Sequence, residues 1–236
     1  MADDRKNLPS RSSRAEVDNF LSRLAVAPRA AGAGGRLLFA MDATASREPS
    51  WDQACRIQGE MFLAADGLGG LAVQLCWYRG LDEFGGGRWV TNARELLEEM
   101  SAVRCRGGQT QIVRVLRHAV AETRRQRVAA LVFVGDCMEE DIDRLCHAAG
   151  ELGLLGVPAF MFHEGHDPVA RKAFEEVARL TKGACCPFDA ASADQLRDLL
   201  AAVAAYAAGG RKALEDFGRR RGGAAALLTS RFSGRR

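Results

Sequence analysis

The sequence predicts a three-layer α/β domain built on a doubly wound, mostly parallel sheet. Short apolar runs alternate along the chain with longer amphipathic segments, which is the order of strands and helices in such domains. Two of the runs, residues 36–41 and 129–135, are apolar almost throughout, as strands covered by helices on both faces are. A glycine-rich stretch at residues 85–87 lies between two further runs and predicts a hairpin, which places one antiparallel strand at an edge of the sheet.

The first half of the chain supplies an N-terminal segment and the first three strands. Residues 1–35 are rich in Ala, Gly, Arg and Ser, which favours a short helix followed by a flexible linker. Ser50 and Gln53 form a capping box that predicts the start of the next helix. The expected elements, in order, are helix 15–24, linker 30–35, strand 36–41, helix 50–65, and strands 71–78 and 88–90.

The second half alternates helices with strands. Asn92 with Glu95 forms another capping box, and Asp167 followed by Pro168 is typical of a helix start, with Asp as the cap and Pro in the first turn. Ser192 caps the last helix. The expected elements are helices 92–103 and 109–124, strand 129–135, helix 139–152, strand 157–162, helix 167–181, strand 184–188 and helix 192–207.

Composition divides the chain into an N-terminal extension at 1–35, a domain at 36–207 and a basic, flexible C-terminal tail at 208–236. The net charge is +3, and six arginines lie between residues 219 and 236 without an acidic residue, so removing them leaves about −3 for the rest. The tail is interpreted as a solubilising segment or a docking peptide. Among the arginine-rich residues 219–236 the only aromatic residue is Phe232, so this segment does not predict specific nucleic-acid recognition.

Composition also indicates a soluble protein of the cytoplasm. The chain is 47% hydrophobic and 27% charged, and no apolar run approaches the roughly 18 residues of a membrane helix. The N-terminal segment has no apolar core of a signal peptide. The number of cysteines is odd and no C-x-x-C pair occurs, which favours reduced thiols; the seven are Cys55, Cys76, Cys105, Cys137, Cys146, Cys185 and Cys186.

Oxygen-bearing side chains gather at three strand-to-loop junctions. Asp42, Thr44 and Ser46 follow the first strand, Thr110 follows a Gly-Gly pair, and Asp136 ends the fourth strand. The carboxyl ends of parallel strands meet at one edge of the sheet, where a crevice forms at the switch of strand order. Carboxylate and hydroxyl oxygens suit a hard cation such as Mg²⁺ or Mn²⁺.

This pattern resembles the metal-ion-dependent adhesion site (MIDAS) of von Willebrand factor A (vWA) domains, over roughly residues 36–206. That family carries D-x-S-x-S after its first strand, then a Thr, then an Asp after its fourth strand. Here the first motif is D-x-T-x-S, so Thr44 replaces a serine while keeping its hydroxyl and adding a methyl group. The resemblance implies a Rossmann-like vWA fold and an intracellular member of bacterial type.

The resemblance also implies how the site binds its metal. Thr44 and Ser46 would touch the ion directly, Thr110 directly or through water, and Asp42 and Asp136 mainly through metal-bound waters. Neutral hydroxyl ligands leave the ion positive, so a protein partner would supply an Asp or Glu. The expected function is therefore a non-enzymatic, divalent-metal-dependent protein-binding module with a regulatory, stress-related or assembly role. No membrane partner is expected, and the sequence does not predict the oligomeric state.

Two enzymatic or ligand-binding alternatives compete with this hypothesis. A Mg²⁺-dependent phosphohydrolase or phosphotransferase would use Asp42 as its nucleophile, but the D-x-D-x-T pattern of such enzymes has Thr44 in place of its second Asp. The only nearby lysines for a phosphoryl group are Lys172 and Lys182, on or at the end of a helix. A nucleotide-binding Rossmann domain is disfavoured because no G-x-G-x-x-G follows the first strand.

Structural readings of the same residues stay open. Asp42, Asp136 and Thr110 could be helix caps, and the Gly107-Gly108 pair could be an ordinary turn rather than an approach to a metal.

Other polar and sulfur-bearing residues have simpler interpretations. Residues 163–167, His-Glu-Gly-His-Asp, do not match a zinc spacing and are interpreted as a solvated loop leading to a helix cap. Cys105 and Cys137 lie close to the predicted site and could act as redox handles. Cys185 and Cys186 are adjacent in a strand and should point to opposite faces.

Overall fold

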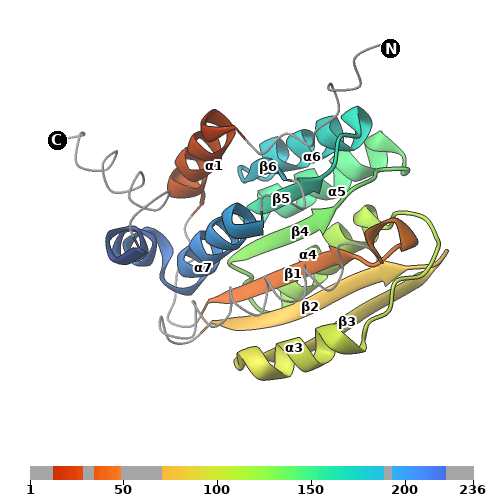
Figure 1. The fold of residues 1–236 in the computed structure, drawn as a ribbon, viewed down its shortest axis with the longest axis horizontal. Coiled ribbons are helices and arrows are strands. Elements are labelled where there is room, and N and C mark those ends of the chain that lie inside the picture. The colour runs from red at the N-terminus through yellow and green to blue at the C-terminus, as the bar shows by residue number, and fades with distance from the viewer. Residues whose placement is uncertain (1–12, 29–34, 49–70, 189–192, 222–236) are drawn as a thin grey trace, which may run out of the picture.

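A six-stranded sheet with helices on both faces forms the body of the computed structural model, which describes residues 13–28, 35–48, 71–188 and 193–221 (Figure 1). The strand order is β3-β2-β1-β4-β5-β6. Neighbouring strands are parallel except β2 and β3. The predicted α/β fold with one antiparallel edge strand is confirmed. The strands are β1 (Arg36–Asp42), β2 (Ala72–Arg79), β3 (Glu83–Val90), β4 (Ala130–Gly135), β5 (Ala159–Glu164) and β6 (Ala184–Phe188).

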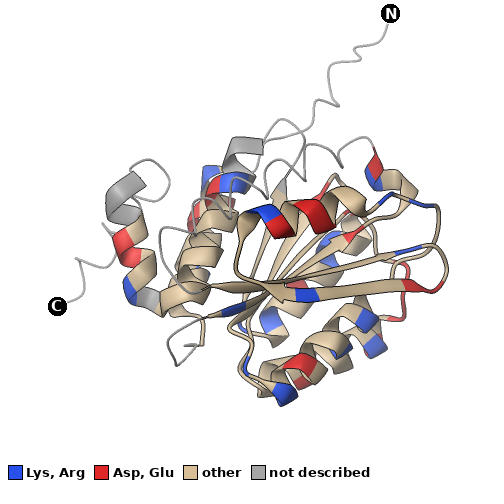
Figure 2. Cartoon of the chain, turned by 90° about the horizontal axis from the view of Figure 1, so that it is seen from below, with Lys and Arg blue, Asp and Glu red and all other residues tan. Residues whose placement is uncertain are grey.

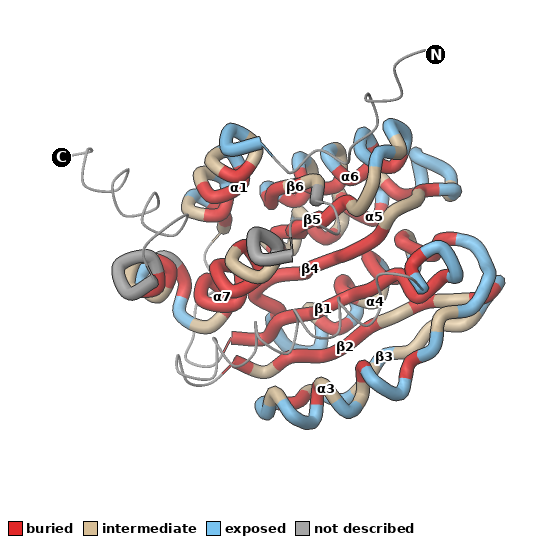
Figure 3. Tube along the Cα trace, in the orientation of Figure 1, coloured by how far each residue is buried: buried red, intermediate tan, exposed pale blue. Residues whose placement is uncertain are grey.

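The two apolar runs singled out in the sequence are the two central strands. Every residue of β1 and β4 is buried (Figure 3). The strands pair in parallel register, with Leu37 opposite Ala130 and Met41 opposite Val134. Their carboxyl ends therefore lie side by side, at the point where strand order runs in opposite directions, and ligands bind at this point in open α/β sheets.

Helices cover the sheet in two layers. One face packs against α1 (Arg14–Val26), α3 (Ala93–Ala102) and α7 (Ala193–Arg221), and the other against α4 (Ile112–Arg125), α5 (Ile142–Leu154) and α6 (Pro168–Leu180). Side chains of β1 alternate between the layers, with Phe39 in the first and Leu38 and Ala40 in the second. Basic and acidic residues lie mostly on the helices, while the strands carry few (Figure 2).

Capping residues set where several helices begin. Asp167 accepts a hydrogen bond from the N–H of Val169, and Pro168 occupies the first turn of α6, as predicted. The helix predicted from 139 begins only at Ile142, because Asp141 is its cap. The side chains of Glu139 and Glu140, which precede Asp141, instead accept hydrogen bonds from Thr110 and from the start of α4.

The hairpin differs from the prediction. β3 extends over Glu83–Val90, so the glycines at 85–87 lie inside the strand, and the turn is at residues 80–82, where Gly80 has φ of 61°. A Cβ on Gly85 would lie 2.3 Å from the indole of Trp77. The glycine thus gives the aromatic ring room to cover the strand, a requirement of tertiary packing.

The last helix breaks close to its predicted end near residue 207, at Gly209 and Gly210, but a second helical stretch follows the break. This stretch continues to Arg221, and its Leu214 and Phe217 are buried in the core. Part of the segment predicted as a tail from 208 to 236 is therefore helical.

The N-terminal helix α1 packs on the same face of the sheet as α7. Its Phe20 ring lies 5.8 Å from that of Phe160 and 5.2 Å from that of Phe162. The domain limits at 36 and 207 stay a prediction. The predicted helix 50–65, most of the linker and residues 222–236 lie outside the described residues. Among the described helices, none has the length and apolar character needed to cross a membrane.

Candidate metal centre

Asp42 ends β1 with a fully buried carboxylate. Oδ1 accepts a hydrogen bond of 2.7 Å from the N–H of Thr44, and Oδ2 accepts one of 2.9 Å from the hydroxyl of Tyr78. Burial raises the pKa of Asp42, the hydrogen bonds from Thr44 and Tyr78 lower it, and the nearby charge of Asp136 raises it again. The net shift is upward, so the ionised form of Asp42 would be stabilised by a further positive charge.

The hydroxyls of Thr44 and Ser46 lie together beyond the strand. Thr44 precedes a 3₁₀ turn, η1 (Ala45–Arg47), and the N–H of Arg47 donates to the carbonyl of Thr44 at 3.1 Å. This turn brings Thr44 Oγ1 to 3.1 Å from Ser46 Oγ. Thr44 is buried and Ser46 is exposed, so the pair joins the interior to the surface.

Thr110 is connected to the loop that follows β4. Its N–H donates to Glu139 Oε2 at 3.1 Å, and the N–H of Glu139 donates to Thr110 Oγ1 at 3.0 Å. Thr110 is not the cap of α4, which begins at Ile112. Instead the carboxylate of Glu140 accepts from the N–H groups of Ile112 and Val113, the latter at 3.0 Å. The N-cap interpretation of Thr110 is therefore wrong, and its hydroxyl retains a lone pair for a ligand.

The segment before Thr110 is attached to both neighbouring loops. The N–H of Arg106 donates to the carbonyl of Ala43 at 3.0 Å, and the N–H of Gln109 donates to that of Gly80 at 3.1 Å. A Cβ on Gly108 would lie 1.9 Å from the carbonyl oxygen of Gly80, whereas one on Gly107 would meet nothing within 4 Å. Gly108 is thus required for the close contact with the β2–β3 turn, while the approach of this loop to a metal stays a prediction.

Asp136 directly follows β4, next to the end of β1. A Cβ on Gly135 would lie 3.5 Å from the Cβ of Asp42, so the two strand ends touch. Asp136 Oδ1 is buried and accepts no hydrogen bond within the described part of the chain. A buried carboxylate oxygen without a donor is uncommon. Because the end of β4 adjoins the end of β1 and its Asp42, such an oxygen fits a hard cation that takes oxygen ligands.

The chemistry of the donors favours such a cation over a softer metal ion that is held by His or Cys ligands. In the described ranges, no group of three or more His, Cys, Asp or Glu side chains could hold a metal ion. A site at the ends of β1 and β4 must therefore depend on hydroxyl oxygens together with two carboxylates.

Four residues that sequence reasoning missed surround the predicted ligands. Tyr78, Glu139 and Glu140 contact or support them as described. Arg47 is 1% exposed and makes an ion pair with Glu164, at the end of β5. The sequence contained one indication for Tyr78. It is a residue with a polar hydroxyl near the end of β2, the strand that pairs with β1 and places Tyr78 opposite Asp42.

The segment at 163–167 was interpreted as a solvated loop leading to a helix cap, which is right for residues 165–167, where Asp167 caps α6, and wrong for His163 and Glu164, which belong to β5. His163 is 1% exposed, and its ring contacts that of Phe174 edge-on at 5.5 Å between centroids. Its neighbour Glu164 is the partner of Arg47. The sequence did not show this because the contact joins two different strand ends.

The two thiols close to the site are not activated. Burial raises the pKa of Cys105 to about 11 and that of Cys137 to about 11. Both remain protonated near neutral pH, which argues against the redox interpretation. In β6, Cys186 packs in the layer with α7 and Cys185 against the layer with α6, as predicted for adjacent strand residues.

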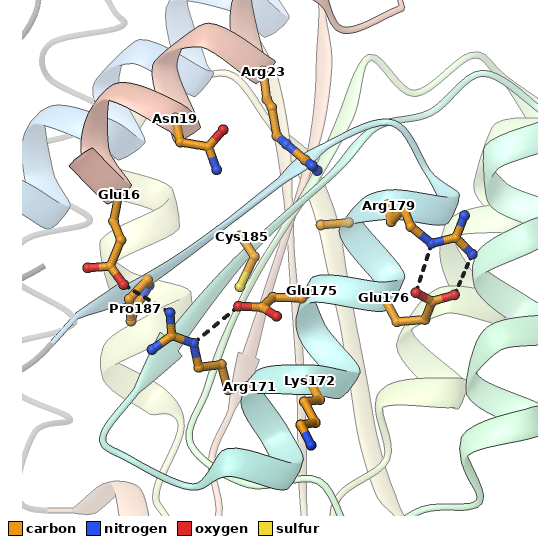
Figure 4. Close-up of a pocket in the computed structure, with 11 residues that line it drawn as sticks. Glu16, Asn19, Arg23, Arg171, Lys172, Glu175, Glu176, Arg179, Cys185 and Pro187 are labelled. Carbon is orange, nitrogen blue, oxygen red and sulfur yellow. Dashed lines mark hydrogen bonds and ion pairs between the residues drawn. The ribbon is translucent and has the colours of Figure 1, made fainter. Parts of the chain in front are cut away.

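A separate cavity of about 370 Å³ lies between α1, α6 and β6 (Figure 4). None of the five candidate ligands lines it, but Lys172 does. Arg171 in its wall pairs with Glu16 at 3.0 Å and with Glu175 at 3.1 Å. Lys172 is thus in a different part of the molecule from Asp42, which counts against the phosphohydrolase alternative. Both carboxylate oxygens of Asp42 also accept hydrogen bonds, unlike an exposed nucleophile.

Comparison with known proteins identifies the fold. No protein-family profile and no curated protein sequence matches the chain. The VWA domain of SpRpn10 is 12% identical, with 75% of this chain and 97% of that one covered and a TM-score of 0.55. A von Willebrand factor type A protein from Catenulispora acidiphila is 15% identical, with 75% and 44% covered and a TM-score of 0.59.

A third similar structure is proximal thread matrix protein 1 from the mussel byssus, with a zinc-occupied MIDAS motif. It is 15% identical, with 73% of this chain and 46% of that one covered and a TM-score of 0.59. This chain thus spans less than half of the second and third proteins. It has the mostly parallel α/β sheet of a vWA-like domain.

Proposed function

We propose that this protein is a non-enzymatic binding module of the cytoplasm that joins a bound Mg²⁺ or Mn²⁺ to an acidic side chain of a protein partner. The observation that carries the proposal is the buried, unsatisfied Oδ1 of Asp136, which follows β4 where this strand adjoins the end of β1; the Thr44–Ser46 hydroxyl pair follows that end of β1. The zinc-occupied MIDAS motif of the mussel protein, which has a similar fold, supports it.

Each ligand has a defined structural support. Tyr78 and the N–H of Thr44 orient Asp42, the 3₁₀ turn aligns Thr44 with Ser46, and Glu139 positions Thr110. When bound, the ion supplies a positive centre that accepts one more anionic oxygen. Three of the five ligands are neutral hydroxyls, so they leave most of that charge for the partner's carboxylate. Exposed Ser46 lies where a partner can approach.

Metal binding is tested first, on the purified full chain. Titration calorimetry with MgCl₂ and MnCl₂ should detect binding in the wild type and lose it in Asp136→Asn. Asp167→Asn is the matched control, because it makes the same charge change at a neighbouring strand-end loop and Asn is an equally good helix cap. Equal metal affinity in wild type and Asp136→Asn would refute the assignment of the site.

Partner binding is tested by capture on the immobilised protein, in Mg²⁺ and in EDTA. Partners of the metal site are the proteins that the wild type captures in Mg²⁺ but that are lost both in EDTA and with Asp136→Asn. Mutation of one acidic residue in such a partner should abolish its capture. An identical set of captured proteins under all conditions would contradict the metal-bridge function.

A further inference from the structure

Arg47 is a buried arginine inside the candidate metal centre. It ends the 3₁₀ turn that carries Ser46, and it ranks among the largest fully buried side chains of the described residues. Removing a guanidinium from water is unfavourable unless carboxylates compensate it. The carboxylates around Arg47 therefore indicate which charges its guanidinium compensates.

This guanidinium connects the turn after β1 with Glu164 at the end of β5, and β4, which is followed by Asp136, lies between those two strands. Glu164, at the end of β5, makes the direct ion pair, with side chains 1% exposed for Arg47 and 15% for Glu164. Burial lowers the pKa of Arg47, while the charges of Asp136 and Asp42, in that order, raise it. Arg47 thus interacts with the same two carboxylates that the proposed metal would use.

The charge of the group depends on this one residue. Three ionised carboxylates and one guanidinium carry a formal charge of −2. With a neutral side chain in place of Arg47 the charge would be −3, and a divalent ion would be held more tightly.

We propose that Arg47 is a tethered cation that competes with the divalent ion for Asp42 and Asp136, and that Glu164 holds its guanidinium aside when the ion binds. This inference rests on the metal-binding function proposed above. Arg47 would keep the buried carboxylates neutralised when no metal is present. It would also weaken metal binding, so that the ion stays only where its concentration, or a partner's carboxylate, favours it.

Titration calorimetry with MgCl₂ on the purified full chain tests the competition. Arg47→Met should bind Mg²⁺ about tenfold more tightly than the wild type or better, since it removes a like charge from a partly desolvated site. Glu164→Gln should bind more weakly, because the guanidinium then turns to Asp42 and Asp136. Unchanged or weaker binding by Arg47→Met would overturn the inference.

A buried arginine at the other end of β1 provides the matched control. Arg36 is 8% exposed and pairs with Glu122 at 3.1 Å, roughly 20 Å from Arg47 by the length of the strand. Arg36→Met should leave the Mg²⁺ affinity unchanged. An equal gain from Arg36→Met would mean that any buried arginine has this effect, which would overturn the local competition.

The double variant Arg47→Met/Glu164→Gln separates competition from net charge. It also limits misfolding, because it removes both members of the buried ion pair and leaves neither without its partner. Competition predicts that it binds Mg²⁺ more tightly than the wild type, although both have the same formal charge. Equal or weaker binding overturns the inference.

The same calorimetry distinguishes a failure of the proposed function from a failure of the competition by Arg47. If Mg²⁺ binds neither to the wild type nor to Arg47→Met, both the function and the inference fall. If Mg²⁺ binds equally to both, only the competition falls. Binding that is detectable in Arg47→Met alone supports the inference, and assigns the weak binding of the wild type to Arg47.

Discussion

Thr110 and Glu139 hold one another through two reciprocal hydrogen bonds, from the N–H of Thr110 to the Glu139 carboxylate at 3.1 Å and from the N–H of Glu139 to the Thr110 hydroxyl at 3.0 Å. The residues are far apart in sequence and lie in two loops. The bonds connect the loop that carries one predicted ligand to the loop that begins with another, Asp136. The position of the hydroxyl is therefore set by a contact that neither loop makes alone.

Glu139→Ala should weaken Mg²⁺ binding by about threefold to tenfold, because the loss of one hydrogen bond of about 1 kcal/mol lets Thr110 move away from the site. Calorimetry on the purified protein measures the change. Glu151→Ala, on the exposed part of α5, is the control and should bind as the wild type does. An unchanged affinity in Glu139→Ala would show that Thr110 is positioned by its own loop.

Tyr78→Phe should lower the free energy of unfolding by about 1–3 kcal/mol, because it removes a donor from a buried carboxylate. Urea denaturation measures this loss. In an Asp42→Asn background the same substitution should cost less, since the partner is then uncharged. Equal losses in both backgrounds would mean that the Tyr78 hydroxyl does not act through the charge of Asp42.

Gly108→Ala should destabilise the protein by about 1–3 kcal/mol, because its Cβ would overlap the carbonyl of Gly80. It should also weaken Mg²⁺ binding, since the loop must shift. Gly107→Ala is the matched control one residue away, where the Cβ meets open space. Thermal unfolding of the two variants should differ clearly; similar melting temperatures would contradict the close approach of Gly108 to the turn.

Leu214→Ala should cost about 2–5 kcal/mol in unfolding free energy, because the side chain is fully buried beyond the kink in α7. Leu81→Ala, at a residue that is 78% exposed, should change stability by less than about 0.5 kcal/mol. If Leu214→Ala is as stable as the wild type, the segment after Gly210 does not contribute to the core.

Stability should fall as the pH drops below about 6.5, in part because of His163. Burial lowers the pKa of His163 in the folded protein relative to the unfolded chain. The unfolded state therefore takes up the proton first, and stability is lost as pH falls from the unfolded pKa towards the folded one. His163→Phe should show a flatter dependence between pH 7 and 5, while exposed His147→Gln should follow the wild type. Identical slopes for all three would exclude this role.

Much of the fold could be predicted from local patterns. The near-continuous apolar runs identified β1 and β4 as central strands, and Asp167 with Pro168 marked the start of α6. Each of these signals is contained within a few neighbouring residues. The error lay at Gly85, where a distant indole decides the conformation. The helical stretch beyond the break at Gly209 and Gly210 was missed, because its burial depends on a distant core.

The five candidate ligands show the same division. The sequence placed Asp42 and Asp136 at the ends of adjacent strands, and the structure brings those ends into contact. It did not predict that Tyr78 bonds Asp42, or that Glu140 and not Thr110 caps α4. These contacts join segments about 30 residues apart or more, so the local spacing of residues does not predict them.

The sequence by itself determined the α/β class, the central strands and the order of the candidate metal-binding residues, because apolar periodicity, capping residues and the spacing of oxygen-bearing side chains are local properties. Only the tertiary structure decided which groups surround that motif. It placed the guanidinium of Arg47 among carboxylates from three strand ends, and it left one oxygen of Asp136 buried without a donor in the described chain. The electrostatics of such a group depend on distance and desolvation, which are properties of the folded chain.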